Sequence, residues 1–383
     1  MTRSAGGPVT GSDRITNLDT VRGVATLGIL VMNVVSFGLI DAGYFNVDAE
    51  GSETWYDRMV GLLGEVFVDQ KTMALFSLLF GVGIVVFADR AAAKGRRPVW
   101  LSLWRNLLLL GIGLLHTLLW EGDILTVYAV CAPILLLARK WSARTLFVLG
   151  GAIMALAAVW AMLAQVAING SDAGAVVELG SFWTVGADDM SDTVGLFFLA
   201  DFFLRALGMM LIGVGLFRSE IVQGQRPADF YRSMARWSLG IGIPLAVAAT
   251  VLQVVNDWDA ETALLGAGIN TFATAPVALG YLALITLWNQ RRSTAVHERI
   301  RAVGRMALTN YLTQTIFGIV VLRNVFEQGE FGRATLFGFV VVVWVIQIAW
   351  SKPWLDRFRF GPFEWVWRML TYVRFEPLRK ATA

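Results

Sequence analysis

The residues best suited to chemistry lie between Arg105 and Tyr128, in the stretch RNLLLLGIGLLHTLLWEGDILTVY. Arg105 and His116 are eleven residues apart, almost three helical turns, so a helix places them on one face about 16 Å apart along its axis. The chain has two histidines, and only His116 lies within an apolar stretch. An imidazole can exchange a proton near neutral pH, which makes His116 a candidate general base. The alternative is a histidine hydrogen-bonded near a membrane surface.

Two carboxylates follow this histidine, Glu121 after five residues and Asp123 after seven. Either one could hold the imidazole in the tautomer that accepts a proton. The first apolar segment repeats the earlier spacing, because Asn33 lies eleven residues after Arg22. An amide in the middle of a membrane needs a partner, so we expect Asn33 either to position a substrate or to bind a neighbouring helix.

Four arginines are candidates for holding an anionic substrate. Arg22 and Arg105 lie near one end of their apolar segments, and Arg96 and Arg97 stand just before the segment that contains Arg105. Guanidinium groups bind phosphate through paired hydrogen bonds, so these residues could bind the phosphates of a coenzyme A thioester. On the first segment, Asp19 lies three residues before Arg22 and could pair with it.

Further polar residues fall within apolar segments and are candidates for substrate binding. They are Lys71 at the start of the second segment, Asp201 and Arg205 in the sixth, and Asn310 and Gln314 in the ninth. Asp201 and Arg205 could equally neutralise one another at i,i+4. The polar stripe of the ninth segment requires a partner in the interior of the bundle.

The composition places these residues in a membrane protein. Of 383 residues, 56% are hydrophobic and 16% are charged, and the mean hydropathy is +0.60. A soluble domain of this size does not need so much apolar sequence. The single cysteine, Cys131, excludes an intrachain disulfide, and no metal site is expected from one cysteine and two histidines.

Ten apolar segments have about the length that a helix needs to cross a bilayer. The predicted spans are 22–41, 71–89, 99–119, 123–139, 144–168, 193–217, 234–254, 264–288, 303–323 and 334–351. The apolar runs are continuous and do not alternate, which predicts an all-α, polytopic membrane helix bundle over residues 14–351. A disordered tail is expected at 1–13 and a cytoplasmic interfacial segment at 352–383.

The distribution of positive charge predicts the orientation. With the N-terminus in the cytoplasm, 26 of the 32 lysines and arginines fall on the cytoplasmic side, and only four fall on the opposite side. Arg105 and Arg205 lie inside the membrane, and the outer loops are acidic. This pattern follows the positive-inside rule, so both termini are expected in the cytoplasm.

Five stretches resemble a known family: LDTVRGVATLGILVMNVVSF, LFSLLFGVG, LLHTLLWEGDILTVYAV, GRMALTNYLTQT and RFGPFEWVWRMLTY. They are similar to the YeiB-like bacterial membrane proteins, domain of unknown function 418, from about Arg14 to Arg379. That family is grouped with the transmembrane acyltransferases. The resemblance therefore implies a bundle in the bacterial inner membrane that moves an acyl group, often acetyl, from a cytoplasmic coenzyme A thioester to a sugar or lipid-linked acceptor.

The sequence departs from that group at one position. Membrane acyltransferase-3 enzymes carry an arginine followed after eleven residues by a histidine on the first helix. Here Arg22 matches the arginine, but Asn33 stands in place of the histidine. An asparagine cannot act as a base, so we expect His116 to take that role, with Glu121 or Asp123 orienting it and Asn33 positioning the substrate.

The leading hypothesis is acyl transfer, with acyl-coenzyme A as the donor substrate, membrane lipids as surroundings and no nucleic acid as partner. A transporter or flippase of a lipid or small anionic solute is the alternative, because it uses the same residue types at similar depth. A non-catalytic membrane scaffold is expected instead if the embedded charges pair with one another and no cavity lies between them.

Overall fold

The computed structural model describes residues 15–171, 173–186, 192–291 and 293–380, and the predicted tail at 1–13 lies outside them. Helices dominate the described residues, which contain no named β-strand. In chain order the helices are α1 (Thr16–Gly38), η2 (Asp41–Tyr44), α2 (Trp55–Phe67), α3 (Lys71–Ala93), α4 (Pro98–Thr117), α5 (Leu125–Ala138), α6 (Ala143–Asn169), α7 (Ala173–Thr184), α8 (Asp192–Arg218), α9 (Ala228–Val255), α10 (Ala260–Asn289), α11 (Ala295–Arg305), α12 (Ala307–Ile319), the π-helix η4 (Val320–Val325), α13 (Arg333–Arg357) and α14 (Pro362–Tyr372).

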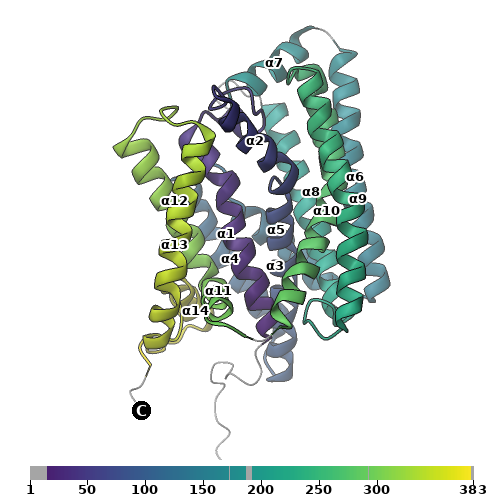
Figure 1. The fold of residues 1–383 in the computed structure, drawn as a ribbon. Coiled ribbons are helices and arrows are strands. Elements are labelled where there is room, and N and C mark those ends of the chain that lie inside the picture. Colours follow the sequence, from purple (N-terminus) through teal and green to yellow (C-terminus); the bar gives the residue numbers. More distant parts are fainter. Residues whose placement is uncertain (1–14, 172, 187–191, 292, 381–383) are drawn as a thin grey trace, which may run out of the picture.

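Eight ranges in the described chain are long and apolar enough to cross a membrane, which confirms the all-α polytopic bundle (Figure 1). They contain α1, α3, α4, α6, α8, α9, α10 and α13. The two other predicted spans, 123–139 and 303–323, are shorter helices. α5 has 14 residues, and α12 has 13 before it continues as the π-helix.

The predicted start of the ninth span is wrong. The helix does not begin at 303, because α11 ends at Arg305 and Met306 leaves helical geometry with φ −112° and ψ 31°. α12 then begins at Ala307 in a new direction. Gly304 is in tight contact with α1, since a Cβ there would lie 2.0 Å from the backbone oxygen of Asp19. This packing fixes α11 against the start of α1.

Short amphipathic helices cover the two ends of the bundle. Figure 1 shows α11 and α14 at the lower end and α2 and α7 at the upper end. We call the lower end, where α1 and α4 begin, the basic end, and the upper end the far end. The sequence prediction had a loop in place of α2 and of α7, and it ended the last span at 351, whereas α13 continues to Arg357.

α1 runs through the middle of the molecule and is buried along most of its length. Small residues permit this, because a Cβ at Gly23 would lie 2.1 Å from the backbone oxygen of Ile300 on α11, and one at Gly28 would lie 2.7 Å from the methyl carbon of Thr72 on α3. α1 therefore contacts its neighbours closely enough to place Arg22 and Asn33 inside the bundle.

Candidate functional site

His116 and Asp123 form a buried pair at the far end of α4. The Nδ1 atom of His116 lies 2.8 Å from Oδ1 of Asp123. The other carboxylate oxygen accepts hydrogen bonds from the backbone nitrogen of Thr126 at 3.0 Å and from its hydroxyl at 3.1 Å. Asp123 therefore anchors the first turn of α5 and orients the imidazole with the same carboxylate.

Gly113 makes this arrangement possible. It lies one turn before His116, and a Cβ there would lie 2.7 Å from the hydroxyl oxygen of Thr126 and 2.9 Å from Oδ2 of Asp123. Only a glycine lets α4 approach the start of α5 this closely. Asp123 is thus the partner of the histidine, whereas Glu121 is exposed and makes no hydrogen bond to it.

Nε2, the second nitrogen of the imidazole, accepts no hydrogen bond from the described residues. Nε2 of His116 is buried and has no hydrogen-bond partner in the part of the chain that the structure describes. Because the Asp123 carboxylate favours the proton on Nδ1, Nε2 is left as a proton acceptor. The Tyr311 hydroxyl donates to Oδ1 of Asp123 at 3.3 Å, and its ring lies 5.3 Å from the imidazole. This arrangement is that of an oriented general base.

The basic end contains a cavity of about 870 Å³ between α1, α3, α4 and α14, which we call the basic cavity. Its cationic lining residues are Arg22, Arg90, Lys94, Arg96, Arg97, Arg105, Arg368 and Arg374. Asp19 and Glu376 are the acids among the lining residues. The structure therefore gathers all four predicted arginines, from α1, α4 and the turn before α4, around one cavity with a large excess of positive charge.

Aromatic rings hold the arginines of this cavity. The Arg105 guanidinium lies 3.7 Å from the ring centroid of Trp367 and 4.6 Å from that of Phe87. The indole of Trp367 also donates to the backbone oxygen of Arg105 at 2.9 Å. Within the described residues, neither Arg105, Arg96 nor Arg97 forms an ion pair. Their charge is available to an anion.

Arg22 differs from these three arginines, because its guanidinium lies 3.6 Å from the Asp19 carboxylate, the pair expected from the sequence. Arg22 nevertheless lines the basic cavity and a second cavity of about 210 Å³ that adjoins it. The two cavities share Arg22, Gly83, Phe87 and Arg105, while aliphatic and aromatic side chains supply much of the remaining wall of the second. We call the second one the connecting cavity.

The far end contains a third cavity of about 650 Å³, the far cavity, whose lining includes Asn33, Glu121, Asp123 and Tyr311. Tyr311 also lines the connecting cavity. His116 itself lines none of these cavities, and its imidazole lies behind Asp123 and Tyr311. Cavities from the two ends of the bundle therefore meet at Tyr311, beside the His116–Asp123 pair.

Asn33 and Lys71 occupy different environments. The Asn33 side chain lines the far cavity and makes no hydrogen bond in the described structure. Lys71 is fully buried, and its ammonium donates to the side-chain oxygen of Asn270 at 2.5 Å and to the backbone oxygen of Glu65 at 2.6 Å. Lys71 thus joins α3 to α2 and α10 through its hydrogen bonds, whereas the amide of Asn33 faces the far cavity.

Two predicted substrate-binding residues lie away from the cavities. Asn310 donates to the backbone oxygen of Val303 at 3.1 Å and accepts from the indole of Trp350 at 3.0 Å. Gln314 donates to Gln347 at 2.9 Å. Both residues are buried and line none of the four cavities described. The polar stripe on this helix therefore joins α12 to α13 through hydrogen bonds. Asp201 and Arg205 form the ion pair that was expected and line a small chamber discussed below.

The sequence analysis did not identify the contribution of α14. The interfacial segment packs on α4 and α12. Arg368 and Tyr372 form part of the wall of the basic cavity, and Trp367 lines the connecting cavity. Glu364 fixes the segment by accepting hydrogen bonds from the Thr309 backbone at 3.1 Å and the Thr309 hydroxyl at 2.5 Å. Burial raises the pKa of the Glu364 carboxyl, and the bonds from Thr309 partly oppose this.

Tyr311 was also missed, although it lies in a stretch that the analysis singled out. It follows Asn310 directly, so it points about 100° away from the polar stripe of α12. A tyrosine in an apolar helix is commonly a packing residue, and only the positions of Asp123 and the two cavities identify this one.

These features define a polytopic α-helical membrane protein with cavities at both ends of the bundle and an oriented histidine between them. Residues 216–374 match the family model described as "Protein of unknown function (DUF418)". The chain is 35% identical to "Uncharacterized protein YeiB" of Escherichia coli, over 94% of this chain and 96% of the relative. It is 30% identical to "Uncharacterized protein YxaH" of Bacillus subtilis, over 98% of each. This chain therefore belongs to the YeiB-like DUF418 family. No solved structure matches it.

Proposed function

We propose that this protein is a membrane-embedded acyltransferase. It moves an acyl group, acetyl in the simplest case, from a coenzyme A thioester in the basic cavity to an extracytoplasmic or lipid-linked acceptor in the far cavity. One observation carries the proposal: the connecting and far cavities both reach Tyr311, whose hydroxyl binds the carboxylate that orients His116. The resemblance of the sequence to transmembrane acyltransferases supports the same reaction.

The donor matches the basic and connecting cavities in charge and shape. Coenzyme A has phosphate groups at one end and a slender chain that leads to the thioester. The guanidinium groups of Arg96, Arg97 and Arg105 suit the phosphates, because no carboxylate neutralises them. The connecting cavity is narrower and largely apolar, and it leads from Arg105 to Tyr311. The chain would lie there with its thioester near Tyr311.

His116 supplies the proton transfers in this mechanism. Nε2 takes the proton of the acceptor hydroxyl as its oxygen attacks the thioester carbonyl carbon, and Asp123 stabilises the imidazolium that forms. The carbon–sulfur bond then breaks, and the thiolate takes the proton back from His116. The products are the acylated acceptor and free coenzyme A. Because Tyr311 and Trp120 flank the imidazole, one of them moves aside when the substrates bind.

The positive-inside rule predicts that the basic end lies in the cytoplasm, where coenzyme A thioesters occur. We accordingly propose that the protein lies in the bacterial inner membrane with both termini in the cytoplasm. The far cavity then faces the extracytoplasmic side, and the acyl group crosses the barrier without passage of the donor.

The decisive test is binding of acetyl-coenzyme A to the detergent-purified, full-length protein. Arg105→Ala is expected to raise the Kd at least tenfold, because it removes an unpaired charge from both cavities. Arg299→Ala is the matched control, since Arg299 is exposed on α11 and lines none of the cavities. Equal weakening in both variants, or no binding to the wild-type protein, would refute the donor site.

A transporter of a small anionic solute is the second candidate. It is favoured by the same geometry, because a single side chain, Tyr311, borders cavities from both ends. This function predicts solute movement into proteoliposomes in the absence of any thioester. Formation of an acylated product by the purified protein would decide for the transferase.

A further inference from the structure

A second polar site adjoins the far cavity. It is a chamber of about 70 Å³ between η2, α2, α8 and α10, and it shares Tyr44, Phe45, Gln70 and Phe198 with the lining of the far cavity. The volume accommodates a few non-hydrogen atoms, which is too small for a sugar ring. The chamber therefore suits a small polar group on a larger molecule that occupies the far cavity.

The lining of the chamber contains more carboxylates than cations. It contains three carboxylates, Glu65, Asp69 and Asp201, and Arg205 is the only cation among the described lining residues. Arg205 pairs with Asp201. Lys71 and Arg333 lie outside the lining but also act on the Glu65 carboxylate. Because the lining itself has three carboxylates and one cation, direct contact with it favours a cation over an anion.

Acceptor groups around the chamber lack partners. The side-chain oxygen of Gln70 and Oδ1 of Asp201 are buried without a hydrogen bond, and the Glu65 carboxylate makes none within the described chain. A primary ammonium has three N–H donors and would satisfy three such acceptors. Two donors, Nε of Arg205 and the indole nitrogen of Trp258, are also unpartnered and suit a neighbouring hydroxyl oxygen.

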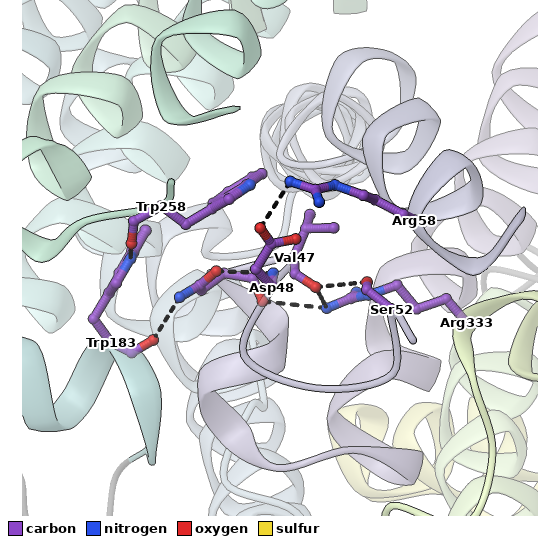
Figure 2. Close-up of polar contacts among 8 residues, drawn as sticks. Val47, Asp48, Ser52, Arg58, Trp183, Trp258 and Arg333 are labelled. Carbon is purple, nitrogen blue, oxygen red and sulfur yellow. Dashed lines mark hydrogen bonds and ion pairs between the residues drawn. The ribbon is translucent and has the colours of Figure 1, made fainter. Parts of the chain in front are cut away.

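Hydrogen bonds between protein groups hold one side of the chamber in place without a ligand. Trp183 donates from its indole to the backbone oxygen of Trp258 at 2.6 Å, and both residues line the chamber (Figure 2). Arg333 of α13 binds the adjoining loop through the backbone oxygen of Val47 at 3.3 Å and the Ser52 hydroxyl at 3.0 Å (Figure 2). The conformational entropy of these residues is therefore lost on folding, and ligand binding does not require a further loss.

We propose that this chamber binds the protonated amino group of an amino alcohol, carried by the acceptor molecule. The identity of this molecule as the acceptor rests on the proposed function, whereas recognition of the amine does not. The acceptor would place its ammonium at Glu65 and its reacting hydroxyl in the far cavity, near Tyr311 and Asp123.

Ethanolamine is the probe for this proposal. The melting temperature of the detergent-purified, full-length protein is measured against ethanolamine hydrochloride at constant ionic strength, with sodium chloride and ethylene glycol as reference solutes. Ethanolamine is expected to raise it saturably, and neither reference solute is expected to do so. Glu65→Gln keeps the shape of the side chain and removes its charge, so the half-saturating concentration should rise at least tenfold. Glu261→Gln makes the same change at an exposed position outside the chamber and should leave it unchanged.

Two results would overturn the proposal: an equal shift with ethylene glycol, or an unchanged half-saturating concentration in Glu65→Gln. If Glu65→Gln does not fold, Asp201→Asn provides the second variant, with the same expected loss. The assay contains no thioester. If ethanolamine does not stabilise the protein but acetyl-coenzyme A still binds, only the proposed amine site is refuted. If acetyl-coenzyme A does not bind but ethanolamine stabilises the protein, the proposed transferase function is refuted and the amine site is retained.

Discussion

Two groups of polar side chains lie in the middle of this bundle and differ in one respect. Between α12 and α13, the amide nitrogens of Asn310, Gln314 and Gln347 all donate to neighbouring helices, although the side-chain oxygen of Gln314 has no partner among the described residues, and neither Asn310 nor Gln314 lines any of the four cavities. Between α1, α4 and α5, the Asn33 amide and Nε2 of His116 have no partner among the described residues. A polar residue in an apolar helix therefore indicates a site when it is left unsatisfied beside a cavity, as Asn33 and His116 are and Gln314 is not.

The largest expected effect tests the second group. His116→Gln retains a side chain that can bond to Asp123 but removes the proton acceptor. The rate of acyl transfer should fall by about 10²–10⁴-fold, the usual contribution of a general base. The measurement is product formation under saturating acetyl-coenzyme A with an accepted acceptor, and thioester binding is the control that should remain. Unchanged turnover would exclude His116 as the base.

Alanine substitutions of Asn310 and Asn33 compare the stability contributions of the two groups most directly. Asn310→Ala leaves several buried partners without hydrogen bonds and should lower the free energy of unfolding by about 2–4 kcal/mol. Asn33→Ala removes an amide that bonds to nothing in the described chain, so its effect should stay within about 0.5 kcal/mol. Reversible unfolding in detergent measures both. If Asn33→Ala proved the more destabilising, the division into bonded and unbonded groups would fail.

The smallest effect concerns Glu364, which joins α14 to α12 and also lines the connecting cavity. Burial raises the pKa of this carboxyl above its ordinary value of 4.5. The folded state therefore binds the proton more tightly than the unfolded state, and its stability falls as the pH rises from 4.5 through the raised pKa.

Glu364→Gln mimics the protonated form and should reduce that pH dependence while α14 stays in place. Melting temperatures of both proteins between pH 4.5 and 8 provide the measurement. Parallel curves for the wild-type protein and the variant would show that another group is responsible.

The long spans could be predicted because the bilayer imposes a length and a composition that are visible in any window of the sequence. The shared site of Arg22, Arg96, Arg97 and Arg105 could be anticipated for a similar reason, since charges near the same end of several spans must lie at one depth. The prediction concerned depth, and the structure adds that these residues surround one cavity.

The remaining parts of the site depend on contacts between different elements, which leave no periodic pattern in the sequence. Asp123 meets His116 through the turn between α4 and α5 and through the missing side chain of Gly113, and spacing alone did not separate it from Glu121. α2, α7, α11 and α14 are short, and their identity as helices depends on what they cover. The hydrogen bonds of Asn310 and Gln314 to α13 could not be predicted, because their partners there are not adjacent in the sequence.

The position of α14 has a consequence for biosynthesis. α14 follows every span in the chain, yet Arg368 and Tyr372 form part of the wall of the basic cavity, and Trp367 stacks on Arg105. While the ribosome is still translating the spans, Arg105 can stack on Phe87 of α3 but not on Trp367, and the part of the cavity wall that α14 contributes is absent. The basic cavity is therefore complete only after α14, the last helix of the described chain, has been synthesised.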